Sequence, residues 1–381
     1  MIKSFTATTR EIDDEEIAVA EILAALEPEK NLLENSLGII SCFSEFEETG
    51  VLKAICDALP FDCIGSTTCI SSVNKQTDRI ILTLTVLTSD DCSFETTVLP
   101  ITENYEESIK STLEPLLNRS GEKPALLLSY FPLMKTVSGD MMLDAIDQTT
   151  GGGIPLFGTT AVDHTIDYST SKTIQNGEAF REAVVLGLIY GNVNYSFDIA
   201  SLDEEKIKKQ KAIITEANGN ILTGVNGKSA LEYLEEFGLT KDDITTGVLP
   251  LVIDHKDGTK SVARAVFALT PDGYAICGGK MPVGATLAVG RVDMVDVLHT
   301  TEETLKNLVE KESVILSYSC IARYLALGTK YTAEAEKMSE ICENIQYLYA
   351  CSGGEICPLI DANGKLINYY HNYTTVFCRL S

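Results

Sequence analysis

Three stretches of the chain repeat one order of apolar and polar positions. The first, residues 37–69, opens with the apolar run LGIISCF, continues with apolar residues at helical spacing, and ends in FDCIGSTT. A short apolar run predicts a buried strand, and apolar residues every three to four positions predict a helix with one buried face. The stretch therefore predicts a strand, a helix and a second strand that ends in a glycine turn.

The same order returns twice. PALLLSYF at 124–131 and IPLFGTTA at 154–161 predict strands on either side of the helix SGDMMLDAIDQTTGG, which has an N-cap at Ser138 and a glycine stop. SVILSYSC at 313–320 and YLYAC predict strands around the helix TAEAEKMSEICENIQ. The alternating segments RIILTLTVLTSDDCSFETTVL, REAVVLGLIYGNVNYSFDIAS and KLINYYHNYTTVFCRL follow the three units and predict paired strands.

A charged segment that is poor in apolar residues, SLDEEKIKKQK at 201–211, predicts a boundary between a domain of residues 1–200 and a domain of residues 201–381. A hairpin around Asn218-Gly219, a short helix and a run of strands with turns at DHKDG, TPDG and MPVG follow it. Hairpins favour antiparallel neighbours. We therefore predict an α/β (α+β) fold of two domains, with mixed, largely antiparallel sheets layered with helices and built from repeated strand–helix–strand–hairpin units.

The charge balance restricts the classes of partner. The 381 residues include 30 basic and 55 acidic ones, a formal net charge of -25. Such a surface repels phosphate backbones and anionic lipids, so we expect no nucleic-acid partner and no membrane partner. A membrane-spanning helix needs about 20 apolar residues in a row, and the sequence has no such run. Its first residues lack the apolar core of a secretory signal, so we expect a cytoplasmic protein.

The cysteines and histidines give no sign of a metal site. Eleven cysteines in a chain without a secretory signal are expected to be reduced core thiols. No CxxC or HExxH occurs, and the histidines, His164, His255, His299 and His371, are far apart in the sequence. We therefore expect no metal ion.

Several motifs resemble those of one protein family, the FIST proteins, which carry paired FIST-N and FIST-C domains. The turns IGSTT and LFGTTAVD are similar to FIST-N, whereas EANGNILTGVNGKSALEYL and SVARAVFALTPDGYAICGGKMPVGATLAVG are similar to FIST-C. LSYSCIAR, GGEICP and HNYTTVFCRL resemble its closing motifs in the right order. One departure is the turn Ser352-Gly353-Gly354-Glu355, where the family usually has an aromatic residue and a single glycine before the glutamate.

The resemblance implies a sensory role in signal transduction, with a pocket for an amino acid or a related small carboxylate metabolite. Many members carry output modules, but the two domains account for all 381 residues here. We therefore expect a free-standing sensor, whose signalling partner is a separate protein.

We expect the ligand pocket at strand ends, where α/β folds place their ligands. Its candidate residues are Arg264, Cys320, Arg323, Gly353, Gly354, Glu355 and Asn372.

Each charged candidate has an alternative interpretation. Arg323 has the fork geometry for a carboxylate, but it could instead form a salt bridge with Glu355. Arg264 lies in a strand where a charge usually faces solvent, and the family match favours a pocket role. Glu355 could receive an ammonium group, after two glycines that allow close approach of the backbone.

Other functions remain open. In an enzyme, Cys320 would be a nucleophile activated by the neighbouring arginine, Glu355 a general acid or base, and His371 an assistant. A haem-binding gas sensor is a further alternative, since haem binding has been proposed for some FIST proteins; it would need an axial His or Cys, and otherwise we expect no cofactor. The hydroxyls of the glycine turns, which belong to Ser66, Thr67, Thr159 and Thr160, are secondary candidates as small anion nests.

Overall fold

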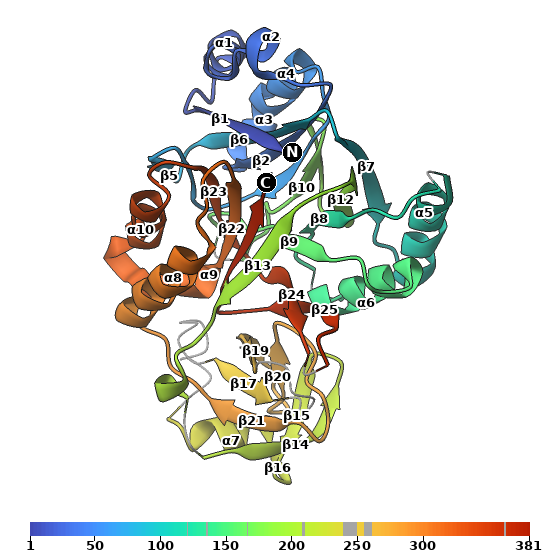
Figure 1. Ribbon diagram of the computed structural model, residues 1–381. Coiled ribbons are helices and arrows are strands. Elements are labelled where there is room, and N and C mark those ends of the chain that lie inside the picture. The colour runs from blue at the N-terminus through green and yellow to red at the C-terminus, as the bar shows by residue number, and fades with distance from the viewer. Residues whose placement is uncertain are drawn as a thin grey trace.

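The body of the molecule contains three sheets with one strand order, as the computed structural model shows (Figure 1). The structure describes residues 1–119, 121–134, 136–165, 167–207, 210–238, 250–254, 261–361 and 363–381. Each sheet is built around a strand–helix–strand unit whose two strands are parallel. The predicted class is confirmed: mixed sheets are layered with helices in two domains.

The first sheet has the order β1-β6-β2-β3-β10-β11. Its unit pairs β2 with β3 in parallel, and β6 lies antiparallel to β2. The elements of this part of the chain are β1 (Lys3–Thr9), α1 (Glu15–Leu26), α2 (Pro28–Asn31), β2 (Asn35–Cys42), α3 (Glu45–Glu48), α4 (Val51–Ala58), β3 (Cys63–Thr67), β4 (Ser71–Val73), β5 (Gln76–Asp78) and β6 (Leu82–Ser89).

The second sheet repeats this order as β7-β12-β8-β9-β24-β25. Here β8 and β9 are the parallel pair, and β12 is antiparallel to β8. The elements of this part are β7 (Cys92–Pro100), α5 (Tyr105–Arg119), β8 (Leu126–Phe131), α6 (Gly139–Thr150), β9 (Leu156–Thr160), β10 (Thr173–Gln175), β11 (Glu178–Phe180) and β12 (Ala183–Gly191).

The third sheet has the order β13-β26-β22-β23-β4-β5, with β22 and β23 as its parallel pair. The elements of this part are β13 (Tyr195–Ala200), α8 (Met294–Leu308), β22 (Val314–Cys320), α9 (Ile321–Leu327), a 3-10 turn (Gly328–Lys330), α10 (Ala333–Ile341), β23 (Gln346–Ser352), β24 (Glu355–Ile360), β25 (Leu366–His371) and β26 (Thr375–Leu380).

Each sheet is completed by a hairpin from another unit. The hairpin β4-β5 of the first unit pairs with β23 of the third, β10-β11 of the second pairs with β3 of the first, and β24-β25 of the third pairs with β9 of the second. The three units therefore exchange hairpins in a closed ring. The second and third sheets take strands from both sides of residue 200, and the boundary proposed there stays a prediction.

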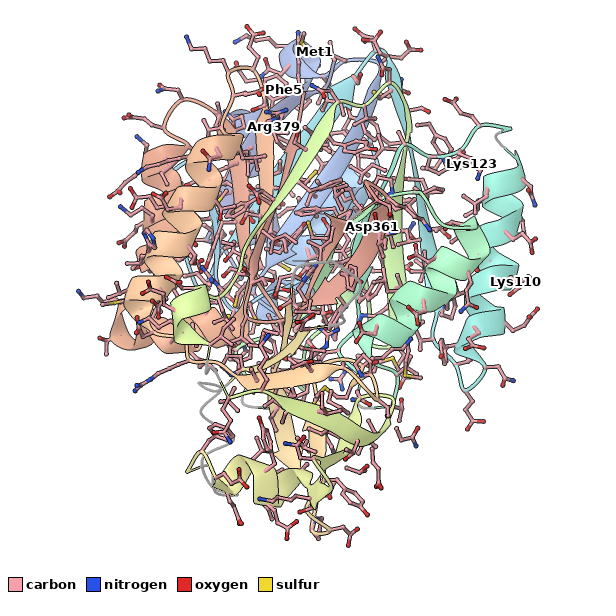
Figure 2. The ribbon with its side chains drawn as sticks, turned by 60° about the horizontal axis from the view of Figure 1, so that its bottom comes forward. Met1, Phe5, Lys110, Lys123, Asp361 and Arg379 are labelled. Carbon is pink, nitrogen blue, oxygen red and sulfur yellow. The ribbon has the colours of Figure 1, made fainter. Side chains whose placement is uncertain are left out.

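The three sheets share one core because their inner faces meet. Alternate residues of β2, β8 and β22 point into it, and the hydroxyls of Tyr130 and Tyr318 hydrogen-bond within it at 2.7 Å. The outer faces pack against helices: α1 and α4 on the first sheet, α5 and α6 on the second, and α8 and α10 on the third. In Figure 2, α5 and α6 run along one side of the molecule and α8 and α10 along the opposite side.

A smaller fourth sheet is inserted between β13 and α8, and it lies at the bottom of Figure 1. The predicted turn at Asn218-Gly219 joins its antiparallel strands β14 and β15. Its elements are a 3-10 turn (Glu204–Lys206), β14 (Ala212–Asn218), β15 (Ile221–Val225), β16 (Lys228–Ser229), α7 (Ala230–Glu235), β17 (Leu251–Asp254), β18 (Val262–Arg264), β19 (Val266–Leu269), β20 (Ala275–Cys277) and β21 (Thr286–Val289). We call this part the inserted sheet. The predicted DHKDG turn lies mostly outside the described residues.

Three predicted strand pairings are wrong. The segments β6 and β7, β12 and β13, and β25 and β26 are consecutive, but each pair divides between two different sheets. Alternation of apolar and polar residues predicts a strand but not its neighbour in the sheet. Two consecutive strands that belong to different sheets therefore have the same sequence pattern as a hairpin. Among the described helices, none is long and apolar enough to cross a membrane.

Candidate functional site

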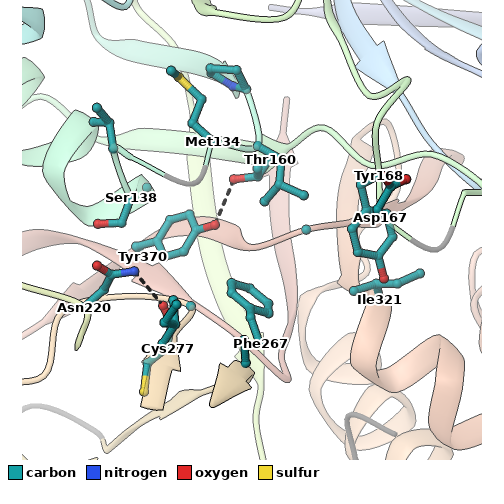
Figure 3. Close-up of a pocket in the computed structure, with 18 residues that line it drawn as sticks. Met134, Ser138, Thr160, Asp167, Tyr168, Asn220, Phe267, Cys277, Ile321 and Tyr370 are labelled. Carbon is teal, nitrogen blue, oxygen red and sulfur yellow. Dashed lines mark hydrogen bonds between the residues drawn. The ribbon is translucent and has the colours of Figure 1, made fainter. Parts of the chain in front are cut away.

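A cavity of about 420 Å³ lies where the second unit, the hairpin β24-β25 and the inserted sheet meet (Figure 3). Its walls come from the loop between β8 and α6, the segment after β9, strands β19 and β20, and the starts of α9 and β24. These are mostly strand ends and loops, where a rigid sheet exposes groups that it does not itself use. Segments far apart in the sequence thus form one hollow.

Tyr370 forms a fixed part of the cavity wall. Its hydroxyl hydrogen-bonds Thr160 Oγ1 at 3.0 Å. The ring packs so closely on Gly139 and Gly354 that a Cβ at either glycine would collide with it. Both glycines are therefore required by the position of this tyrosine.

A buried aspartate shapes the loop on the far side of the cavity. Both carboxylate oxygens of Asp163 accept hydrogen bonds, from the backbone N–H and hydroxyl of Thr165 at 2.6 and 2.5 Å and of Thr170 at 2.6 and 2.8 Å. The loop thereby presents Asp167 and Tyr168 to the cavity, with Tyr168 in the left-handed region at φ 54°. A bulky residue adopts this conformation only where its surroundings enforce it.

The described wall is mainly apolar and carries a few polar groups. Ser138 belongs to the wall, but its hydroxyl oxygen is buried, is not accessible from the cavity and has no hydrogen-bond partner among the described residues. Asp167 is the charged member of the described lining, and a hydrogen bond from Ser169 lowers its pKa, so it is ionised at neutral pH. Burial raises the pKa of the Cys277 thiol to about 12, so this thiol is neutral. The site therefore offers hydrogen bonds and one negative charge.

Arg264 lies behind the cavity wall and does not face solvent. Its side chain is 2 % exposed and pairs with Asp140 at 3.3 Å, while Nη1 donates to the Tyr370 carbonyl at 2.7 Å. Lys280 pairs with Asp144 beside it. These two ion pairs join the inserted sheet to α6. Arg264 thus holds the two walls of the cavity together rather than lining it.

Arg323 is buried, but its ion pair is not with Glu355. It is 1 % exposed and donates to Glu334 through Nε at 3.1 Å and Nη2 at 2.8 Å. Burial favours the neutral form of Glu334, but the charge of Arg323 and hydrogen bonds from Ser319 and Thr301 bring its pKa below its usual value. The predicted Arg323–Glu355 pair is wrong because α10 places a different carboxylate beside the arginine.

Glu355 is fully buried beside Thr374, whose hydroxyl donates to Oε2 at 2.7 Å. Its Oε1 has no hydrogen-bond partner among the described residues. Burial raises its pKa to about 8, so the carboxyl is protonated at neutral pH. Glu355 pairs with Thr159 across β24 and β9, and the equivalent pair in the first sheet is Thr173 with Ser66. Because a threonine occupies the equivalent position there, the repeated fold does not itself require a carboxyl.

Asn372 is also fully buried, and it packs against Gly278, a residue of the cavity wall. Its Oδ1 accepts from the Ala265 N–H at 3.3 Å, and its Nδ2 has no partner among the described residues.

The predicted catalytic set is held in neutral forms. Burial, reinforced by Glu355, raises the pKa of the Cys320 thiol well above its usual value and outweighs the lowering by Arg323, so the expected activated thiol is wrong. Burial lowers the pKa of His371 to about 4, and its Nε2 lies 3.0 Å from the Cys357 carbonyl. Neither side chain lines the cavity. At neutral pH these residues provide no thiolate, carboxylate or imidazolium.

Among the secondary candidates, most hydroxyls serve the strand-end turns. Thr67 Oγ1 accepts from the Lys172 N–H at 2.9 Å, and Thr159 Oγ1 donates to the Thr160 carbonyl at 3.2 Å. Ser66 is buried on β3. Of all the predicted site residues, Thr160 and Gly353 line the cavity.

The described histidines lie on separate segments, with His299 on α8 and His371 on β25. His164 lies against Phe43 with ring centroids 4.4 Å apart, and His255 lies outside the described residues. Within the part of the chain that the structure describes, no group of three or more His, Cys, Asp or Glu side chains is placed to hold a metal ion. Haem binding stays an untested alternative.

Comparisons with known proteins agree with the sequence motifs. A model of the FIST N domain matches residues 36–228, and a model of the FIST C domain matches residues 230–358. A solved structure described as "Cyanuric acid hydrolase: evolutionary innovation by structural concatenation" is similar to 76% of this chain and 99% of its own, with 8% identity and a TM-score of 0.30. No curated protein sequence matches significantly.

Proposed function

Because the chain belongs to the FIST family, whose domains act in sensing and signal transduction, we propose that it is a sensor whose small ligand binds in the cavity beside Tyr370. The observation that carries this proposal is the cavity itself, because residues from both matched regions enclose about 420 Å³ behind a mainly apolar wall. Concave, mostly apolar hollows with a few polar groups are where proteins bind small ligands.

The position of the cavity gives binding a route to a signal. Ser138 and Thr160 belong to the region that matches FIST N, and Phe267 and Gly353 to the region that matches FIST C. A ligand that contacts both regions stabilises the arrangement in which both walls reach it. The signalling partner, a separate protein, would respond to the population of that arrangement.

The volume of about 420 Å³ suits a small metabolite. An amino acid or related small carboxylate, which the family resemblance implies, has suitable dimensions. However, Arg264 and Arg323 are engaged in ion pairs away from the wall. The described lining instead supports a ligand with apolar parts and a few hydrogen-bonding groups.

A binding screen with matched variants tests the proposal. Calorimetry and thermal shift with amino acids, amines, alcohols and organic acids should identify a compound that stabilises the full chain. Ala268→Phe fills the cavity from exposed strand β19, whereas Ala20→Phe adds the same ring to an exposed position of α1. We expect the first variant to lose binding and the second to keep it. Failure of every compound to bind, or equal binding by both variants, would refute the proposal.

A further inference from the structure

Three aromatic side chains from three separate segments surround the cavity. Tyr168 comes from the loop after β9, Phe267 from β19 and Tyr370 from β25 (Figure 3). Phe267 is 47 % exposed, which is high for a phenylalanine side chain. A ring left open towards a cavity is available to a ligand rather than to the protein core.

The wall holds two of these rings, Tyr168 and Tyr370, in place before any ligand binds. Tyr370 is fixed by Thr160 and by its contact with two glycines. Tyr168 lies in a loop that the carboxylate of Asp163 fixes through four hydrogen bonds, and its backbone is held in the left-handed region. Preorganised aromatic walls reduce the ordering that binding would otherwise require.

The described part of the cavity lining carries a negative charge. Among the lining residues that the structure describes, none is basic, and Asp167 is ionised at the edge of the hollow. The whole chain adds a formal net charge of -25, which raises the local concentration of cations. A free carboxylate here would meet the charge of Asp167 and find no basic partner among those residues.

We propose that the ligand is a small organic cation, an amine or quaternary ammonium, bound against Tyr168, Phe267 and Tyr370 with Asp167 as its counter-charge. This inference rests on the proposed sensor function. The faces of aromatic rings attract ammonium groups, and alkyl groups around the nitrogen suit an apolar wall.

Choline and its uncharged isostere 3,3-dimethyl-1-butanol separate charge from shape, because a carbon replaces the nitrogen in the alcohol. Calorimetry with the full chain should show binding of choline or of a simpler amine, ethanolamine, with the isostere at least ~10-fold weaker than choline. Phe267→Leu keeps an apolar side chain without the ring, and Asp167→Asn removes the charge without changing the shape. Each variant should weaken binding of the cation by ~3-fold or more and leave binding of the alcohol unchanged.

The outcomes distinguish the two proposals. If the alcohol binds as well as choline, or if only uncharged or acidic compounds bind, the preference for a cation is wrong and the sensor proposal stands. If no compound of any class binds in the cavity, both proposals are wrong.

Discussion

The ion pair between Arg323 and Glu334 gives the sharpest test of the structure. Both side chains are almost completely buried, at 1 % and 0 % exposure. Arg323→Met removes the guanidinium but keeps a long apolar side chain, and Glu334 is then left in the interior without its counter-charge. A second change, Glu334→Gln, removes that charge but keeps an oxygen for the surrounding hydroxyls, which belong to Thr301, Ser319, Tyr349 and Thr375.

The expected magnitudes follow from the cost of an isolated buried charge. Removing one partner of a buried pair destabilises a protein by about 3–5 kcal/mol, because the remaining charge has lost its compensation. Removing both charges leaves hydrogen bonds between neutral groups. The double variant should therefore be more stable than Arg323→Met alone, by about 2 kcal/mol, so that the second mutation restores part of what the first one loses.

Urea unfolding of the wild type and of the single and double variants at pH 7 measures these differences. The pKa of Glu334 is lower in the folded protein than in the unfolded chain. The ion pair therefore stabilises the protein at pH values above the ordinary carboxyl pKa, and this stabilisation is lost as the pH falls through the pKa of the folded protein. The gap between the wild type and Arg323→Met should therefore narrow in acid. A loss below about 1 kcal/mol in Arg323→Met, or a double variant less stable than that single one, would refute the reasoning. Ligand binding should be unaffected in folded Arg323→Met.

Three further changes test the surroundings of the cavity. Glu355→Gln should gain stability relative to the wild type as pH rises from 4.5 to about 8, because the Glu355 carboxyl ionises near pH 4.5 in the unfolded chain but only near pH 8 in the folded protein. A difference in unfolding free energy between the two proteins that stays constant over this pH range in urea unfolding would contradict the burial of the carboxyl. Gly354→Ala should cost about 1–3 kcal/mol and weaken ligand binding, since its Cβ displaces Tyr370 from Thr160; an unchanged melting temperature would show that the ring is not held as described. Iodoacetamide should label Cys320 in the native protein no faster than the other buried thiols, and selective labelling seen by mass spectrometry would restore it as a nucleophile.

Local patterns in the sequence were sufficient for most of the elements but not for their arrangement. The run PALLLSYF and the glycine stop at Gly151 predict β8 and the end of α6, since both signals lie within a few residues. In contrast, the segment containing β6 and β7 alternates as a hairpin does, but β6 pairs with β1 and β2 whereas β7 pairs with β12. The partner of a strand depends on contacts across the whole chain, which periodicity does not contain.

For the candidate site, too, local sequence patterns indicated some positions but not which residues come together. Of the residues that the glycine turns at strand ends suggested, Thr160 and Gly353 lie at the cavity, and their role in binding stays a prediction. The partner of Arg264 was not predictable, since Asp140 lies 124 residues away and only folding brings them together. The aromatic wall was missed because Tyr168, Phe267 and Tyr370 come from separate segments. The local sequence does not single them out, since Phe267 for example stands between Val266 and Ala268.

The ring of exchanged hairpins has a consequence for synthesis on the ribosome. Ser72 of β4 and Tyr347 of β23, whose hydroxyls hydrogen-bond, are 275 residues apart in the chain. The first hairpin therefore emerges long before its partner strand is translated, and the second sheet waits in the same way for β24. Nascent chains expose these unpaired edges for most of translation, so chaperones that shield β-strands should influence the yield of this protein more than its final stability.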